Sequence, residues 1–169
     1  SVHRAGREAR RIVEAARAEL AAALGARPQD VVFTSGGTEA NRLALTGTGR
    51  NRLLASAVEH ASVAAFCAPA NQLAVDANGS LDLDALHAAL ADNGPDTLVS
   101  IMLANNETGT IQPIMEAAEI IHAAGALLHC DAIQGLGKLA LEMRTLGADL
   151  LTVSAHKIGG PAGVGALVI

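Results

Sequence analysis

Short apolar runs alternate with stretches of helical periodicity along this chain, and this alternation restricts its fold more than any other feature. The apolar runs, each suited to a buried strand, lie at 31–34, 52–56, 72–75, 97–103, 126–130, 149–154 and 164–169. Stretches with helical periodicity lie at 3–24, 83–91 and 114–124, and a further helix is expected to begin at Thr38. Strands that alternate with helices predict an α/β fold with a mainly parallel sheet.

The core of this fold must be built almost entirely from aliphatic side chains. The chain has 169 residues, enough for one domain with a substantial core. Phe33 and Phe66 are its only aromatic residues, so Leu, Val, Ile and Ala must fill the interior. In the first helical stretch, apolar residues at helical spacing form a stripe, namely Val13, Ala16, Leu20 and Leu24.

Charge and cysteine content exclude several classes of protein. The net charge is −5 and the basic residues form no stripe, which argues against nucleic acid as the main partner. No apolar run is long enough to cross a bilayer, so no membrane partner is expected. Cys67 and Cys130 both lie among apolar neighbours and are typical of reduced core residues. These features predict a cytoplasmic protein.

Lys157 follows an apolar run at 150–154 and precedes Gly159-Gly160-Pro161. A partly desolvated lysine loses its proton more easily and becomes a nucleophile towards carbonyl groups. Considered alone, however, Lys157 also fits an ordinary surface lysine between a strand and a loop. Polar residues elsewhere in the chain favour the chemical role.

Polar residues follow five of the expected strands, where ligands collect in open α/β sheets. In chain order they are Ser35-Gly36-Gly37-Thr38, Glu59-His60-Ala61-Ser62, Asn105-Asn106-Glu107-Thr108-Gly109, Asp131 with Gln134, and Ser154 with His156 and Lys157. Each group has an ordinary alternative, because glycine pairs and amides are common in turns and a lone histidine is often structural.

Taken together, the five groups match the needs of one cofactor, pyridoxal phosphate. The amides of a glycine-rich turn that opens a helix suit a phosphate, although this turn is neither a Walker motif nor a Rossmann fingerprint. A carboxylate at Asp131, after an apolar strand, needs a cationic partner. The cofactor requires an anion site, an acid at its ring nitrogen and a lysine for its Schiff base.

A metal site is the competing interpretation of the same residues. Its ligands would be His60, His129, Asp131 and His156. No pair among them has the tight spacing of a zinc site, so the sequence favours the organic cofactor and predicts no metal.

Five motifs in order carry a resemblance to a known family, and they lie at 33–41 (FTSGGTEAN), 59–60 (EH), 105–114 (NNETGTIQPI), 129–134 (HCDAIQ) and 154–161 (SAHKIGGP). The chain resembles the cysteine desulfurases of the class V aminotransferase group, within the fold-type I pyridoxal-phosphate enzymes. The resemblance runs nearly end to end. It implies a three-layer α/β/α arrangement with a mainly parallel sheet.

By position, the resemblance also implies a role for each site residue. Lys157 would carry the cofactor as a Schiff base, and His60 would stack on the ring and move protons. Asp131 would pair with the ring nitrogen, while Asn106 and Gln134 would contact the ring's phenolic oxygen or the substrate. Phosphate contacts are implied for residues at two strand ends, namely Gly37, Thr38, Ser154 and His156. Ile133 departs from the small or hydroxylated residues usual at its position.

The resemblance further implies that residues 1–169 are a pyridoxal-phosphate-binding large domain, truncated at both ends and without the small C-terminal domain. The family's sulfur-accepting cysteine and its substrate-binding arginine lie past residue 169. Neither Cys67 nor Cys130 matches that cysteine, and both are expected to be structural. The fragment alone is therefore expected to be inactive.

The expected activity of the whole enzyme is removal of sulfur from L-cysteine, leaving L-alanine and an enzyme persulfide. The persulfide would serve a sulfur-acceptor protein such as an iron–sulfur scaffold, and the enzyme would be a homodimer. Another class V activity, such as selenocysteine lyase or aminotransferase, is one alternative. A non-catalytic fragment that binds cofactor is another.

Overall fold

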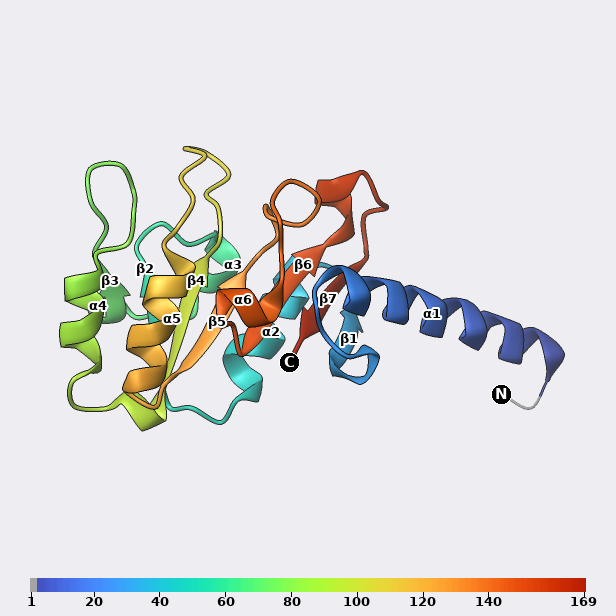
Figure 1. The fold of residues 1–169 in the computed structure, drawn as a ribbon, viewed down its shortest axis with the longest axis horizontal. Helices are drawn as coiled ribbons and strands as arrows, with labels where there is room; N and C mark the ends of the chain where they lie inside the picture. Colours follow the sequence, from blue (N-terminus) through green and yellow to red (C-terminus); the bar gives the residue numbers. More distant parts are fainter. Residues whose placement is uncertain (1–2) are drawn as a thin grey trace.

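A seven-stranded sheet organises residues 3–169, which are the residues that the computed structural model describes (Figure 1). The strands are β1 (Val31–Thr34), β2 (Arg52–Ser56), β3 (Gln72–Leu73), β4 (Thr97–Met102), β5 (Leu127–Asp131), β6 (Leu150–Ser154) and β7 (Gly165–Val168). Their order across the sheet is β1-β7-β6-β5-β4-β2-β3. Within this sheet β7 is antiparallel to both of its neighbours, and the other pairs are parallel. The predicted mainly parallel α/β fold is confirmed.

The helices of the described residues are α1 (Arg4–Ala23), α2 (Gly37–Gly47), α3 (Ala61–Ala64), α4 (Leu83–Leu90), α5 (Ile114–Ala123) and α6 (Met143–Leu146). Short 3₁₀ turns lie at Pro28–Asp30, Pro69–Asn71, Gly94–Asp96 and Ala155–Ile158. The helices predicted at 3–24, 83–91 and 114–124 agree with α1, α4 and α5 to within one residue at each end.

Two apolar cores lie on opposite faces of the sheet. The larger joins the C-terminal end of α1 with α4, α5 and α6, and includes Leu128 and Leu151. The smaller joins α2 and α3 to Leu98, Leu150 and Leu167. Leu150 and Leu151 belong to different cores because successive side chains of a strand point to opposite faces. Helices on both faces make the expected three-layer α/β/α arrangement.

Several strands are shorter than the apolar runs that predicted them. Strand β3 stops at Leu73, because Val75 pairs with Leu81 in an isolated antiparallel bridge instead. Strand β6 begins after Asp149, whose carboxylate accepts a hydrogen bond from the backbone N–H of Leu128 at 2.7 Å. Strand β5 extends one residue further than predicted and includes Asp131.

Helix α1 is buried only near its C-terminal end. Val13 is 45% exposed, whereas Ala21 and Leu24 are buried in the larger core. Figure 1 shows the rest of α1 extending away from the sheet. The apolar stripe predicted along this helix therefore contacts the sheet over its last turns alone. Within residues 3–169, no helix combines the length and apolar character that a membrane span requires.

The polar residues of five strand ends gather at one edge of the sheet. Strands β2, β4, β5 and β6 are parallel, and β1 has the same direction as β6 because each is antiparallel to β7. The carboxyl ends of all five strands therefore open to the same edge, where open α/β sheets bind ligands.

Candidate active site

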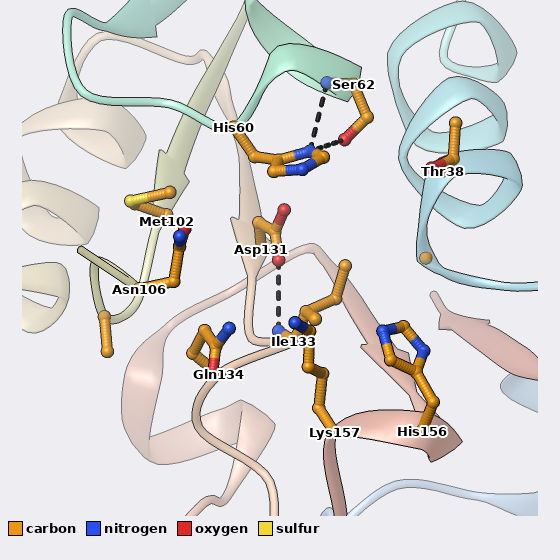
Figure 2. Close-up of a pocket in the computed structure, with 12 residues that line it drawn as sticks. Thr38, His60, Ser62, Met102, Asn106, Asp131, Ile133, Gln134, His156 and Lys157 are labelled. Atoms are coloured by element: carbon orange, nitrogen blue, oxygen red, sulfur yellow. Dashed lines mark hydrogen bonds between the residues drawn. The ribbon is translucent and has the colours of Figure 1, made fainter. Parts of the chain in front are cut away.

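A pocket opens at the carboxyl edge of the sheet and collects most of the predicted site residues (Figure 2). Its lining consists of Gly37, Thr38, His60, Ser62, Met102, Ala104, Asn106, Asp131, Ile133, Gln134, His156 and Lys157. Eight of the nine residues assigned to the site from the sequence are in this lining. The ninth, Ser154, lies behind His156 and is buried.

The glycine-rich turn contributes Gly37 to one wall of the pocket, and its two glycines are needed for different reasons. Gly36 has φ +153°, a conformation open in practice to glycine alone. A Cβ atom on Gly37 would lie 2.2 Å from Cδ1 of Ile133, so a side chain at this position would require Ile133 to move. No side chain caps α2, whose first turn opens here, and its first amides remain available to an anion.

Asp131 ends β5 and holds a buried carboxylate, with 4% of the residue exposed. Its Oδ1 accepts a hydrogen bond from the N–H of Ile133 at 3.0 Å, and its Oδ2 accepts one from Nδ2 of Asn41 at 2.7 Å. No lysine or arginine of residues 3–169 forms an ion pair with it. Burial raises the pKa of Asp131, although these hydrogen bonds favour the anion. The position suits a cation supplied by a ligand.

His60 is the N-cap residue of α3 and lies across the pocket from Lys157 in Figure 2. Its Nδ1 accepts a hydrogen bond from the backbone N–H of Ser62 at 3.1 Å and lies 2.8 Å from Oγ of Ser62. The sequence placed this histidine at a helix start without indicating what held its ring.

Lys157 and His156 lie on the 3₁₀ turn that follows β6. Figure 2 shows the Lys157 side chain extending from this turn towards Asp131. Lys157 is exposed and lines the pocket. Nδ1 of His156 lies 2.8 Å from Oγ of Ser154, so the hydroxyl group fixes the imidazole.

Two amide side chains complete the lining on the other side. Oε1 of Gln134 accepts a hydrogen bond from Nζ of Lys138 at 2.6 Å, and Figure 2 shows its amide nitrogen directed into the pocket. Asn106 is exposed on the loop after β4. Its neighbour Asn105 has a structural role, because its Oδ1 accepts hydrogen bonds from the N–H groups of Glu107 and Thr108.

Glu59 carries a buried carboxyl group to which no role was assigned from the sequence. The residue is half-buried as a whole, but its Oε2 is buried and has no hydrogen-bond partner within residues 3–169. Its Oε1 accepts hydrogen bonds from Oγ of Ser56 at 2.8 Å and from the N–H of Met102 at 2.6 Å. Burial, and next the charge of Asp131, raise the pKa of Glu59 to about 8. Glu59 thus links the ends of β2 and β4 as a neutral acid at pH 7.

The metal interpretation finds no geometric support. Among residues 3–169 no group of three or more His, Cys, Asp or Glu side chains is placed to hold a metal ion. His129, one of the ligands considered, is fully buried in β5. Its two ring nitrogens contact Oγ of Ser100 at 2.8 Å and Oγ1 of Thr152 at 3.2 Å.

Comparison with known proteins finds sequence relatives that are cysteine desulfurases. The cysteine desulfurase of Gluconacetobacter diazotrophicus is 42% identical over all of this chain, which covers 45% of that protein. The cysteine desulfurase IscS of Dictyoglomus turgidum is also 42% identical over all of this chain and 46% of its own length. The chain therefore spans about half the length of these relatives.

Solved structures agree with these sequence relatives. A NifS-like protein from Rickettsia africae superposes with a TM-score of 0.93 at 38% identity, over 99% of this chain and 49% of that protein. A structure of SspA in complex with cysteine gives a TM-score of 0.91 at 31% identity, over all of this chain and 52% of that protein. The sequence profile of the family described as aminotransferase class-V matches residues 1–169. The chain therefore belongs to the class V aminotransferase family and has the fold of its NifS-like cysteine desulfurase relatives.

Proposed function

We propose that residues 1–169 form the pyridoxal-phosphate-binding large domain of a cysteine desulfurase. The observation that carries this proposal is the buried Asp131, which forms no ion pair within residues 3–169 and lies in the same pocket as Lys157. Identity of about 42% to curated cysteine desulfurases favours this activity over the other class V reactions.

The residues present fit the cofactor at each of its polar groups. The uncapped first turn of α2, with Gly37 and Thr38, suits a phosphate, and His156 lines the pocket beside it. A protonated ring nitrogen would supply the cation that Asp131 lacks and would lower the pKa that burial raises. The amide nitrogen of Gln134 and the side chain of Asn106 can donate hydrogen bonds to an oxygen on the ring.

When bound, pyridoxal phosphate draws electrons away from the α-carbon of an amino acid. The chain's own residues orient that chemistry. Lys157 would bind the cofactor through Nζ, and Asp131 would hold a proton on the ring nitrogen. His60 would cover one face of the ring, and Ser154 would fix the imidazole of His156 near the phosphate.

L-Cysteine is the proposed substrate, and the structural relative whose name records bound cysteine supports this choice. The whole enzyme would release L-alanine and pass the sulfur, as a persulfide, to an acceptor protein such as an iron–sulfur scaffold. We propose that it acts as a homodimer in the cytoplasm. Light scattering tests the dimer, and a clean monomer at micromolar concentration would contradict it.

Cofactor binding can be tested in this chain because it contains two lysines, Lys138 and Lys157. Adding pyridoxal phosphate should produce the visible absorption band of a lysine-bound cofactor. Lys157→Ala should abolish the band, while the matched control Lys138→Ala should keep it, since Lys138 is not among the residues that line the pocket. Borohydride reduction and peptide mass mapping should place the cofactor on Lys157. A band that survives in Lys157→Ala would refute the assignment.

Turnover is a separate question, because sulfur transfer needs a reactive thiolate. Both cysteines are free and buried, and burial raises the pKa of the Cys67 and Cys130 thiols. We therefore expect no persulfide on this chain after incubation with cofactor and cysteine. Release of alanine well above the rate of free pyridoxal phosphate would contradict this expectation.

A further inference from the structure

A continuous chain of buried hydrogen bonds lies behind the pocket and connects three strands to α2. Oγ of Ser100 contacts Nδ1 of His129 at 2.8 Å, and Nε2 of His129 contacts Oγ1 of Thr152 at 3.2 Å. Oγ1 of Thr152 then donates to Oδ1 of Asn41 at 2.6 Å. Ser100, His129, Thr152 and Asn41 are all fully buried. None of these side chains has a role in the proposed cofactor contacts.

Asn41 joins this chain to both sides of the pocket. Its single amide nitrogen donates to Oδ2 of Asp131 at 2.7 Å and to Oγ of Ser62 at 2.9 Å. A side-chain amide has two N–H donors on that nitrogen, so both bonds form at once. Ser62 in turn contacts His60. Asn41 therefore connects Asp131, at the end of β5, with His60, at the start of α3.

The donor and acceptor of each of these hydrogen bonds follow from the Asp131 carboxylate at one end of the series. A carboxylate only accepts, so Asn41 must present its nitrogen to Asp131 and its oxygen to Thr152. The hydroxyl group of Thr152 then donates its hydrogen to Oδ1 of Asn41, so Nε2 of His129 must donate to Oγ1 of Thr152. Because Oγ of Ser62 accepts from Asn41, its own hydrogen is free to donate to Nδ1 of His60.

The same atom of His60 receives a second, independent donor. The backbone N–H of Ser62 points at Nδ1 at 3.1 Å, and a backbone amide can only donate. With two donors directed at it, Nδ1 has no room for a hydrogen of its own. The other nitrogen, Nε2, makes no hydrogen bond with residues 3–169, although the ring lines the pocket.

We infer that Asn41 is a positioning residue that, through Ser62, holds His60 in its Nε2–H tautomer while it also holds the Asp131 carboxylate. His60 then faces a bound ligand as a hydrogen-bond donor at Nε2, towards an oxygen or nitrogen lone pair. In this state it has no lone pair at Nε2 with which to accept a proton. The tautomer is a property of the chain alone, whereas the ligand's identity rests on the proposed function.

The tautomer can be read directly by long-range ¹H–¹⁵N NMR on the chain labelled in its histidines, without cofactor. The spectrum of His60→Gln assigns the His60 signals. We expect Nε2 of His60 to carry the hydrogen and Nδ1 to be bare, in one tautomer. A hydrogen on Nδ1, or an even mixture of tautomers, would overturn the inference. Because cofactor is absent, failure of this test is distinct from failure of the Lys157 assignment.

Two variants test the connection itself. Ser62→Ala removes the hydroxyl donor at a half-exposed position, and we expect a fraction of His60 with hydrogen on Nδ1 to appear. Asn41→Asp leaves Ser62 with an acceptor in place of a donor, so the hydroxyl hydrogen should turn from His60 to the introduced carboxylate. A fraction of His60 with hydrogen on Nδ1, which is absent from the wild type, should then appear.

Thr152→Val covers the case in which Asn41→Asp does not fold. It removes the hydroxyl donor to Oδ1 of Asn41 and leaves Asp131 to hold the amide, so the amide should hold Ser62 less firmly and a smaller Nδ1–H fraction should appear without a new buried charge. His122, which contacts Asp149 at 3.0 Å away from the chain of bonds, is the internal control in every sample. Unchanged His60 signals in both Ser62→Ala and Thr152→Val would show that Asn41 does not set the tautomer.

Discussion

The buried carboxyl group of Glu59 should make the stability of this protein depend on pH in a direction unusual for a glutamate. The folded chain raises the pKa of Glu59 from its ordinary value of 4.5 to about 8, chiefly by burial and then by the charge of Asp131. Between these two values the folded chain keeps the proton and the unfolded chain releases it. The contribution of Glu59 to the free energy of unfolding therefore falls as pH rises through this range.

The size of the effect follows from the same two values. Each pH unit between 4.5 and about 8 should cost about 1.4 kcal/mol, and the limit over the whole interval is about 5 kcal/mol. Glu59→Gln keeps the acceptor for the N–H of Met102 and cannot ionise. The wild type minus Glu59→Gln difference in unfolding free energy should therefore decrease steadily as pH rises from 5 to 8.

Urea unfolding at half-unit pH steps measures this difference. Glu119→Gln, an exposed position on α5, is the matched control and should give a difference that does not change over the same interval. If the Glu59→Gln difference is also constant with pH, the carboxyl group is ionised in the folded chain at neutral pH. The account of Glu59 as a neutral link between β2 and β4 would then be wrong.

Two further perturbations test other parts of the interior. Burial lowers the pKa of His129 to about 3, so the contribution of His129 to the free energy of unfolding should be lost as pH falls below 6.5. The wild type minus His129→Gln difference in urea unfolding should shrink by about 1.4 kcal/mol per pH unit, and a constant difference would contradict this. Gly37→Ala should cost about 1–3 kcal/mol by clashing with Ile133, and Ile133→Val should relieve it. A Cβ atom on Gly165 would lie 2.6 Å from the backbone of Gly36, so Ile133→Val should not restore the stability lost in Gly165→Ala. If Ile133→Val restored stability equally in Gly37→Ala and in Gly165→Ala, the packing argument would be refuted.

Most of the fold could be predicted because it depends on local patterns. Buried parallel strands appear as short apolar runs, and the helices between them follow a spacing of three to four residues. Features that depend on tertiary contacts could not be predicted from the sequence. Nothing local to Val13 says that the sheet ends before reaching it, and nothing local to Val75 says that Leu81 pairs with it.

The candidate site likewise contains residues that could be predicted from the sequence and one that could not, and the difference has a physical cause. Residues such as Lys157 and Asp131 could be found because a parallel sheet brings its carboxyl strand ends together, so a polar residue after an apolar run is already a candidate. Asn41 gives no such signal, since it lies inside α2 and does not directly follow an apolar run. Its importance arises from partners 21, 90 and 111 residues away, which only the folded chain brings within hydrogen-bond distance. Strand order therefore determines which groups meet a ligand, while the buried amide determines which hydrogens those groups present.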